Sequence, residues 1–227
     1  MEAFNPDSHY KKMFTKHIVK PLVGEGFKRY KSSNIARITE DSIFQLFNFQ
    51  KEAYGGKAYT VNVAIRPLYI PHENISLQPG ERIGYFSHGY DHWWSYKDEI
   101  TSESSFLEVS SIITNTILPM LNDLGTSTSL LNEFFNKKYA LKWPTSECWR
   151  LNDLAFMCLK LGDFRKSNEL FIKARNSFKN IGFEWALSAA ETCDKVISMI
   201  GSEGDKVSNY LEFCESETRK NLGLTEW

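Results

Sequence analysis

The stretch from Ser42 to Pro67 constrains the fold most, because it has the pattern of a β-hairpin. Its first arm, residues 42–51, is rich in aromatic and β-branched residues, and its second arm, residues 58–66, alternates strictly between apolar and polar. The Gly55-Gly56 pair between the arms tolerates positive φ and suits a hairpin loop. A sheet with one apolar face needs helices to cover that face, so the hairpin predicts an α+β fold.

The alternation also predicts which side chains share a face of the hairpin. The apolar faces coincide if Phe49 lies near Val63 and Phe47 lies near Ile65. The reverse face then carries Asn48, Gln50, Thr60, Asn62 and Arg66, with Arg37 and Arg82 nearby. An arginine beside amides can hold a carboxylate or phosphate, although a solvated outer face explains the same pattern.

Around the hairpin, helical and extended patterns alternate. We expect a helix over residues 8–23 that ends or bends near Pro21, strands over 27–31 and 34–39, and a short strand over 82–86. A helix over residues 106–124 should kink or break at Pro119, and a short helix should follow over residues 130–136. These elements form a predicted α+β domain over residues 1–140, an antiparallel meander flanked by helices.

The last third of the chain is helical in pattern. Helices are predicted over residues 147–160, 163–179, 183–200 and 205–220, paired around Gly162 and around residues 201–204. Residues 141–227 are therefore a predicted helical domain of two antiparallel helical hairpins. The first hairpin resembles a tetratricopeptide repeat, because residues 160–164 are close to its turn signature and Ala155, Ser167 and Ala174 fall at its small positions. No proline closes the unit, and the second hairpin fits the 34-residue period poorly, so a simple helical pair packed on the first domain is the alternative.

The first part of the chain resembles a family called domain of unknown function 4304, over about residues 8–135. The resembling segments occur in the family's order, at residues 21–28, 35–37, 47–51, 59–63, 81–84 and 93–94, before a long helix. The resemblance implies an antiparallel sheet with helices on one side. The family has no established reaction, so the resemblance implies no site residues; its members look like small bacterial cytoplasmic proteins, some loosely associated with toxin–immunity loci.

Composition argues against several classes of protein. The formal net charge is −1, which gives no global attraction to nucleic acid or acidic lipid. The N-terminus lacks a secretory pattern, and no apolar run reaches the roughly 20 residues of a membrane span. The four cysteines lack metal-ligand spacing and sit in apolar helical patterns, so we expect buried, reduced thiols in a cytoplasmic protein.

No catalytic motif stands out, and we predict no catalytic residue, metal or cofactor. His88 and His92 are the one histidine pair with metal-like spacing, but the third ligand would have to come from elsewhere, such as Glu81 or His72. Trp93 and Trp94 lie in the densest aromatic segment, where core packing competes with a role in partner recognition. In an extended segment only one of these two rings can point inward.

The leading functional hypothesis is a non-enzymatic module that binds an unidentified protein partner, as an immunity-type or adaptor protein does. The alternative is a small-ligand binder or hydrolase that uses the polar sheet face; the candidate binding residues are Asn48, Gln50, Asn62, Arg66, Arg82, Trp93 and Trp94. A structural homodimer through the hairpin edge is a third hypothesis. The sequence leaves the oligomeric state open.

Overall fold

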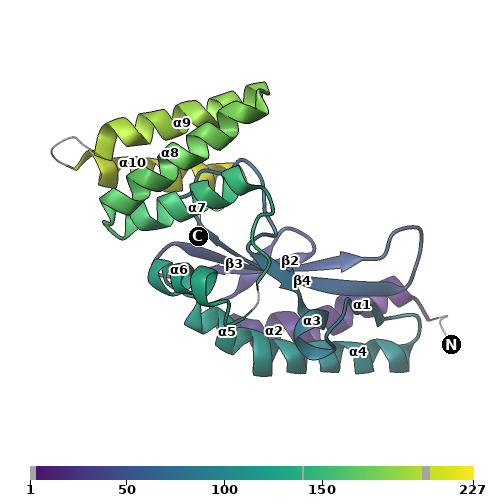
Figure 1. Cartoon of the computed structure of the whole chain (residues 1–227). Helices are drawn as coiled ribbons and strands as arrows, with labels where there is room; N and C mark the ends of the chain where they lie inside the picture. The colour runs from purple at the N-terminus through teal and green to yellow at the C-terminus, as the bar shows by residue number, and fades with distance from the viewer. Residues whose placement is uncertain (1–3, 140, 201–204) are drawn as a thin grey trace. The chain divides into compact units, whose positions relative to one another are not determined.

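A computed structural model describes residues 4–139, 141–200 and 205–227, and its central element is a six-stranded antiparallel sheet (Figure 1). Five strands follow the order β1-β2-β3-β4-β5, and β6 pairs with β4 beside β5. The strands are β1 (Lys28–Tyr30), β2 (Asn34–Ile38), β3 (Ile43–Lys51), β4 (Ala58–Pro67), β5 (Gly80–Arg82) and β6 (Trp94–Ser95). The predicted α+β class is confirmed.

In the β3–β4 hairpin each face carries the predicted residues, but the two strands pair in a different register. The amide of Glu52 donates to the carbonyl of Ala58 at 2.9 Å, which sets Phe49 opposite Val61 and Asn48 opposite Asn62. The predicted pairing of Phe49 with Val63 is therefore wrong by two residues. Because side chains alternate with a period of two, this shift leaves the same residues on each face.

The first helix starts earlier than predicted and passes through its proline. It comprises α1 (Pro6–Met13), a π-helical segment (Phe14–Val19) and α2 (Lys20–Val23). Asn5 caps it, since its side chain accepts a hydrogen bond from the Ser8 amide at 3.0 Å. The amide of Lys20 reaches back five residues to Thr15, and this wider turn makes room for the ring of Pro21.

The long helix that contains Pro119 also has a π-helical segment before its proline. It comprises α4 (Glu99–Ile112), a π segment (Ile113–Ile117) and α5 (Leu118–Asp123), and Asp98 caps its start by accepting from the Thr101 amide at 2.8 Å. The amide of Leu118 reaches back to Ile113. A π turn therefore precedes each proline, and the predicted break at Pro119 does not occur.

Two short segments differ from the prediction. Residues 83–86 were expected to continue a strand, but β5 ends at Arg82 and α3 (Ile83–Ser87) follows directly. The helix expected over residues 130–136 begins earlier, as α6 (Ser127–Asn136), because Thr126 and Ser129 form a capping box.

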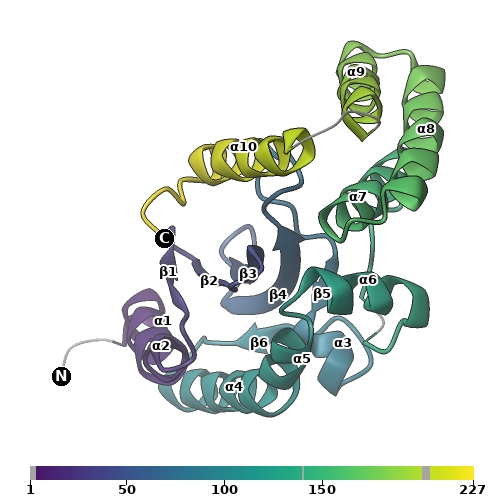
Figure 2. The ribbon, with the colours of Figure 1, turned by 90° about the vertical axis from the view of Figure 1, so that its left-hand side faces the viewer.

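One face of the sheet is covered by helices α1, α2 and α4, as Figure 1 and Figure 2 show. Tyr59 lies at the centre of this core, with its ring centroid 4.8 Å from that of Phe106 and 5.3 Å from that of Tyr10. These three side chains are at most 6% exposed. Most of the aromatic residues near the hairpin thus stabilise the core, as large rings do when buried.

The C-terminal helices follow the predicted bounds closely. They are α7 (Glu147–Lys160), α8 (Phe164–Ile181), α9 (Glu184–Ile200) and α10 (Lys206–Leu222). The Ser167 hydroxyl donates to the Ala155 carbonyl at 2.9 Å, so two small residues let α7 and α8 approach closely. All four cysteines are free and buried in these helices, whereas the predicted connection at residues 201–204 lies outside the described residues.

The chain divides into two compact units whose segments alternate along the sequence. The first unit comprises Met1–Thr39, Phe44–Ile65 and Leu77–Asp123, and the second comprises Glu40–Ile43, Arg66–Ser76 and Leu124–Trp227. A compact unit is not the same as an independently folding domain, so the predicted division at residue 140 stays a prediction. Over the described residues, none of the helices has the length and apolarity needed to cross a membrane.

Candidate binding pocket

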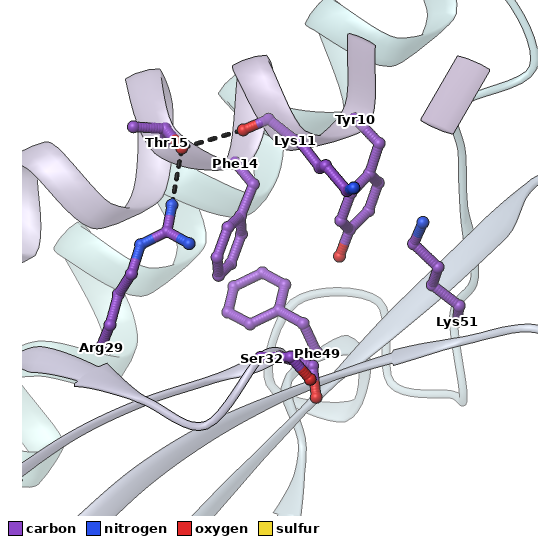
Figure 3. A pocket seen from close by; sticks show the side chains of 9 residues that line it. Tyr10, Lys11, Phe14, Thr15, Arg29, Ser32, Phe49 and Lys51 are labelled. Carbon is purple, nitrogen blue, oxygen red and sulfur yellow. Dashed lines mark hydrogen bonds between the residues drawn. The ribbon is translucent and has the colours of Figure 1, made fainter. Parts of the chain in front are cut away.

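A pocket of about 530 Å³ lies in the first unit, between the first helix and strands β1 and β3 (Figure 3). Its lining residues come from three places. The helix contributes Tyr10, Lys11, Phe14 and Thr15; β1 and the turn after it contribute Arg29, Ser32 and Ser33; β3 contributes Phe49 and Lys51. The volume is within the range of small-molecule sites in proteins.

The inner wall of the pocket is aromatic. Phe14 and Phe49 meet edge to face, with ring centroids 4.8 Å apart and an interplanar angle of 74°. Tyr10 lies one helical turn before Phe14, so the helix directs both rings at the sheet. Burial raises the pKa of Tyr10, which keeps its hydroxyl neutral. The wall therefore offers flat apolar surface and no negative charge.

The rim of the pocket is cationic and is drawn from three different elements. Arg29 donates to the Thr15 hydroxyl at 2.7 Å, and that hydroxyl donates to the Lys11 carbonyl at 2.9 Å (Figure 3). The Arg29 guanidinium also lies 5.3 Å from the Phe14 ring centroid. These contacts hold the guanidinium in place, and in the described part of the chain neither Arg29 nor Lys11 forms an ion pair with a carboxylate.

Lys51 differs from the other two cations because it already has an acidic partner. Its ammonium lies 2.8 Å from one oxygen of Asp7, and the ammonium of Lys57 lies 2.8 Å from the other. Hydrogen bonds from Lys51 and Lys57 lower the pKa of Asp7 to about 2. Asp7 therefore stays ionised at neutral pH and offsets part of the positive charge at this side of the pocket.

The polar sheet face predicted as a site carries a ladder of amides. Asn48 donates to Asn34 at 2.7 Å, and Asn62 donates to Asn48 at 3.0 Å and, more weakly, to Gln50 at 3.5 Å. The three asparagines lie directly opposite one another on β2, β3 and β4. Their side chains bond mainly to each other, so their main role in this structure is to link the strands.

Arg66 and Arg82, the two candidate arginines of this face, each have an acidic partner. Arg66 forms two hydrogen bonds to Asp153, at 2.8 and 3.0 Å, and both side chains are buried within the second unit. Burial raises the pKa of Asp153, and the Arg66 guanidinium opposes that shift. Arg82 stands opposite Asn62 on β5 but pairs with Asp91 and stacks on Trp93. A ligand role for this face stays a prediction.

The two adjacent tryptophans have different environments, as expected for an extended segment. Trp94 is 2% exposed and packs against Tyr59, whereas Trp93 is half-buried under the Arg82 side chain. Trp94 therefore belongs to the core, and Trp93 stacks with the guanidinium of Arg82. Their proposed part in partner recognition remains untested.

The metal-like histidine pair is brought together with a carboxylate that the sequence did not indicate. One ligand atom each from His88, His92 and Glu108 lies within 4.8 Å of the others. Neither of the third ligands considered from the sequence, Glu81 or His72, belongs to this group. Glu108 lies on α4, twenty residues after His88, and only the fold reveals that proximity.

Residues 18–123, just under half of the chain, match a family model described as a domain of unknown function, DUF4304. The match supports the resemblance noted for this part of the sequence; the tetratricopeptide-like hairpin lies outside it. Neither the curated proteins nor the solved structures include a significant match to the chain.

Proposed function

We propose that this chain is a binding protein whose first unit holds a small ligand that carries both a negative charge and a flat apolar group. One observation supports this most directly: Arg29 and Lys11 project at the rim of an aromatic-walled pocket without an acidic partner among the described residues. An arginine held by a hydrogen bond but free of a carboxylate is suited to a carboxylate or phosphate from outside.

The pocket separates two kinds of contact. The Phe14 and Phe49 rings offer a surface for a planar group, and Arg29 with the Ser32 hydroxyl offers donors at the pocket mouth. A ligand with its charge at one end and an aromatic ring at the other matches this arrangement. This site lies on the helix-covered face of the sheet, so it replaces the polar face as the preferred location for a small ligand.

The experiment is a thermal-shift and calorimetric screen of the full chain against aromatic carboxylates and nucleoside monophosphates. Arg29→Met keeps the apolar stem of the side chain and removes its charge, so it should weaken every binder by about tenfold or more, the value of a charge-assisted hydrogen bond. Arg165→Met is the matched control, since the Arg165 side chain is 90% exposed and lies on α8, outside the pocket.

A second variant tests the sign of the electrostatic argument. Asp7→Asn releases Lys51 from its acidic partner, so it should strengthen binding of the same probes. The proposal fails if none of the anionic aromatic probes binds, or if Arg29→Met leaves their affinity unchanged.

The second candidate function is the binding of a protein partner by the helical unit, as an immunity-type or adaptor protein would do. The observation in its favour is a cluster at the start of α9, where Phe183, Trp185 and Leu187 are 66%, 48% and 45% exposed. Trp185 is stacked on Trp149 with ring centroids 5.9 Å apart, so this surface is preorganised. The tetratricopeptide-like pairing of α7 and α8 is part of this same proposal.

A tagged pull-down from the native cell tests the second candidate. A stoichiometric partner should be lost with Phe183→Ser and retained with Phe213→Ser, a control on α10 whose side chain is 57% exposed. A partner that binds both variants equally would place the interface elsewhere.

A further inference from the structure

We propose that His88, His92 and Glu108 form a binding site for one divalent transition-metal ion of the zinc type. Each residue contributes one ligand atom, and these atoms lie within 4.8 Å of one another. The site is separate from the pocket of Figure 3, because the two share no residue.

Three different elements bring the ligands together. His88 directly follows α3 as its C-cap residue, and its amide donates to the Gly84 carbonyl at 2.7 Å. His92 lies in the following loop, and Glu108 faces both from α4. The Nε2 of His88 and an oxygen of Glu108 are 2.8 Å apart, and the two imidazole centroids are 4.3 Å apart.

Packing holds the loop of His92 in place. A methyl group added at Gly84 would come within 2.7 Å of the His92 amide nitrogen, so the loop approaches α3 as closely as glycine allows. His92 also packs against the buried Trp94, with ring centroids 4.7 Å apart and an interplanar angle of 68°. Asp91 is tied to Arg82 by an ion pair. The imidazole of His92 is thus positioned before any ion arrives, as metal sites require of their ligands.

The spacing suits an ion after a small adjustment. Zinc bonds to nitrogen and oxygen are about 2.0–2.1 Å, so ligand atoms in a tetrahedral site are about 3.3 Å apart. The His88–Glu108 pair must therefore open by about half an ångström for an ion to enter. The Glu108 side chain is 44% exposed and the His88 side chain 28% exposed, so both have room to move.

The donor set selects the class of metal. Two imidazoles with one carboxylate suit zinc, cobalt or nickel, whereas magnesium and calcium prefer a shell of oxygens. Three protein ligands leave a coordination position for water, in contrast to structural zinc sites with four protein ligands. None of the four cysteines belongs to this group of ligands.

The test is calorimetric titration of the metal-free full chain with Zn²⁺, with Mg²⁺ as a negative control, and with Co²⁺ for its visible spectrum. We expect one zinc ion per chain. His88→Gln and Glu108→Gln should each weaken zinc binding by at least about tenfold, since each removes one of three ligands. Glu99→Gln and His9→Gln are matched controls that should bind zinc as the natural chain does; Glu99 is exposed on the same helix as Glu108.

Three outcomes would overturn the proposal. The first is absence of one-to-one zinc binding by the natural chain. The second is undiminished binding by the Glu108→Gln and His88→Gln variants, with their folding checked by circular dichroism. The third is a thiolate-to-cobalt charge-transfer band, which would place the ion on the buried cysteines.

Discussion

At the scale of single residues, Arg66, Asp153 and His72 form a buried set of titratable side chains in the second unit. The Arg66 guanidinium donates a hydrogen bond to each oxygen of the Asp153 carboxylate. The same guanidinium lies 3.5 Å from the Nδ1 of His72. The His72 backbone is also fixed, because Thr218 accepts a bond from its amide and Asn221 donates to its carbonyl. A protonated imidazole next to a fixed guanidinium would be strongly disfavoured.

This arrangement predicts a pH-dependent stability. Burial and the neighbouring Arg66 lower the pKa of His72 to about 2, whereas an unfolded histidine titrates near 6.5. Below pH 6.5 the unfolded chain therefore binds a proton that the folded chain does not, and the free energy of unfolding falls as pH falls. The slope from His72 alone should reach about 1.4 kcal/mol per pH unit.

Urea denaturation at several pH values between about 5 and 7 checks this prediction. His72→Gln should remove the His72 contribution to the slope, so the difference between the two proteins isolates it. His9→Gln serves as a histidine control that leaves this set intact. Equal slopes for the natural chain and His72→Gln would contradict the predicted shift.

The sequence could place Arg66 but not its partner. Strict alternation put Arg66 on the same face as Asn62, and that assignment needs no tertiary information. Asp153 is 87 residues away, in a helix whose apolar neighbours gave no reason to expect a buried charge. Likewise, the sequence did not single out the pocket residues Arg29 and Lys11. Composition could not show that both lie over an aromatic wall.

At the scale of elements, the docking of β5 on β4 depends on the absence of one side chain. Gly80 stands opposite Ala64, and a methyl group there would lie 2.3 Å from the Val63 carbonyl and 2.4 Å from the Leu77 carbonyl. Both obstacles are backbone atoms that belong to the sheet or its approach, so neither can rotate away. A side chain at position 80 would therefore force the backbone of β4 or of the segment before β5 to shift.

Gly80→Ala should accordingly destabilise the protein by about 3 kcal/mol, at the upper end of the cost of overpacking. Gly24→Ala is the control, because its added methyl group would have only the Pro21 carbonyl nearby, at 3.8 Å. The midpoints of urea unfolding compare the two variants. If Gly80→Ala unfolds at the same urea concentration as Gly24→Ala, the close approach of β5 to β4 is not needed for stability.

Local patterns predicted long elements better than short ones. The hairpin and helices α7 to α10 have enough residues for their periodicity to be clear. Residues 83–87 have too few, and their mixture of Tyr85 and Phe86 with Gly84 fits a strand as well as the helix that forms. The group of His88, His92 and Glu108 could be found only in part, since a loop and a distant helix supply its members.

At the scale of the whole molecule, the two compact units are interleaved in the sequence. The second unit takes residues 66–76, which include the last two residues of β4 and the segment after it, and Tyr69 there donates to the Ser127 hydroxyl at 2.8 Å. Leu68, Tyr69 and Ile70 are at most 1% exposed. A segment in the first half of the chain therefore depends on the second half to be buried.

A chain that ends after Asp123 should consequently fail to fold as a compact monomer, although it includes the whole segment matched by the family model. It would leave Leu68, Tyr69 and Ile70 without their partners from residues 124–227, which exposes an apolar patch. Light scattering and fluorescence of an apolar dye report aggregation and exposed apolar surface. A monomeric truncated chain with cooperative unfolding and no dye binding would contradict this expectation.

Sequence patterns located a change in composition near residue 141, because the chain becomes wholly helical there. They could not assign residues 66–76 to the later helices, since side-chain burial by distant elements leaves no periodic signal in so short a loop. The order of elements was therefore accessible from sequence, whereas the interleaving of the units was not.

The π turns ahead of Pro21 and Pro119 bear on how this chain should be aligned with others. A π turn contains one residue more than the α turn it replaces, so each helix carries the equivalent of a single-residue insertion just before its proline. The extra residue shifts the helical phase, so the side chains before it and those after it no longer follow a single repeat of 3.6 residues per turn. A relative without the proline is expected to lack the extra residue as well. The corresponding alignment gap then belongs between Phe14 and Val19 in the first helix and between Ile113 and Ile117 in the second.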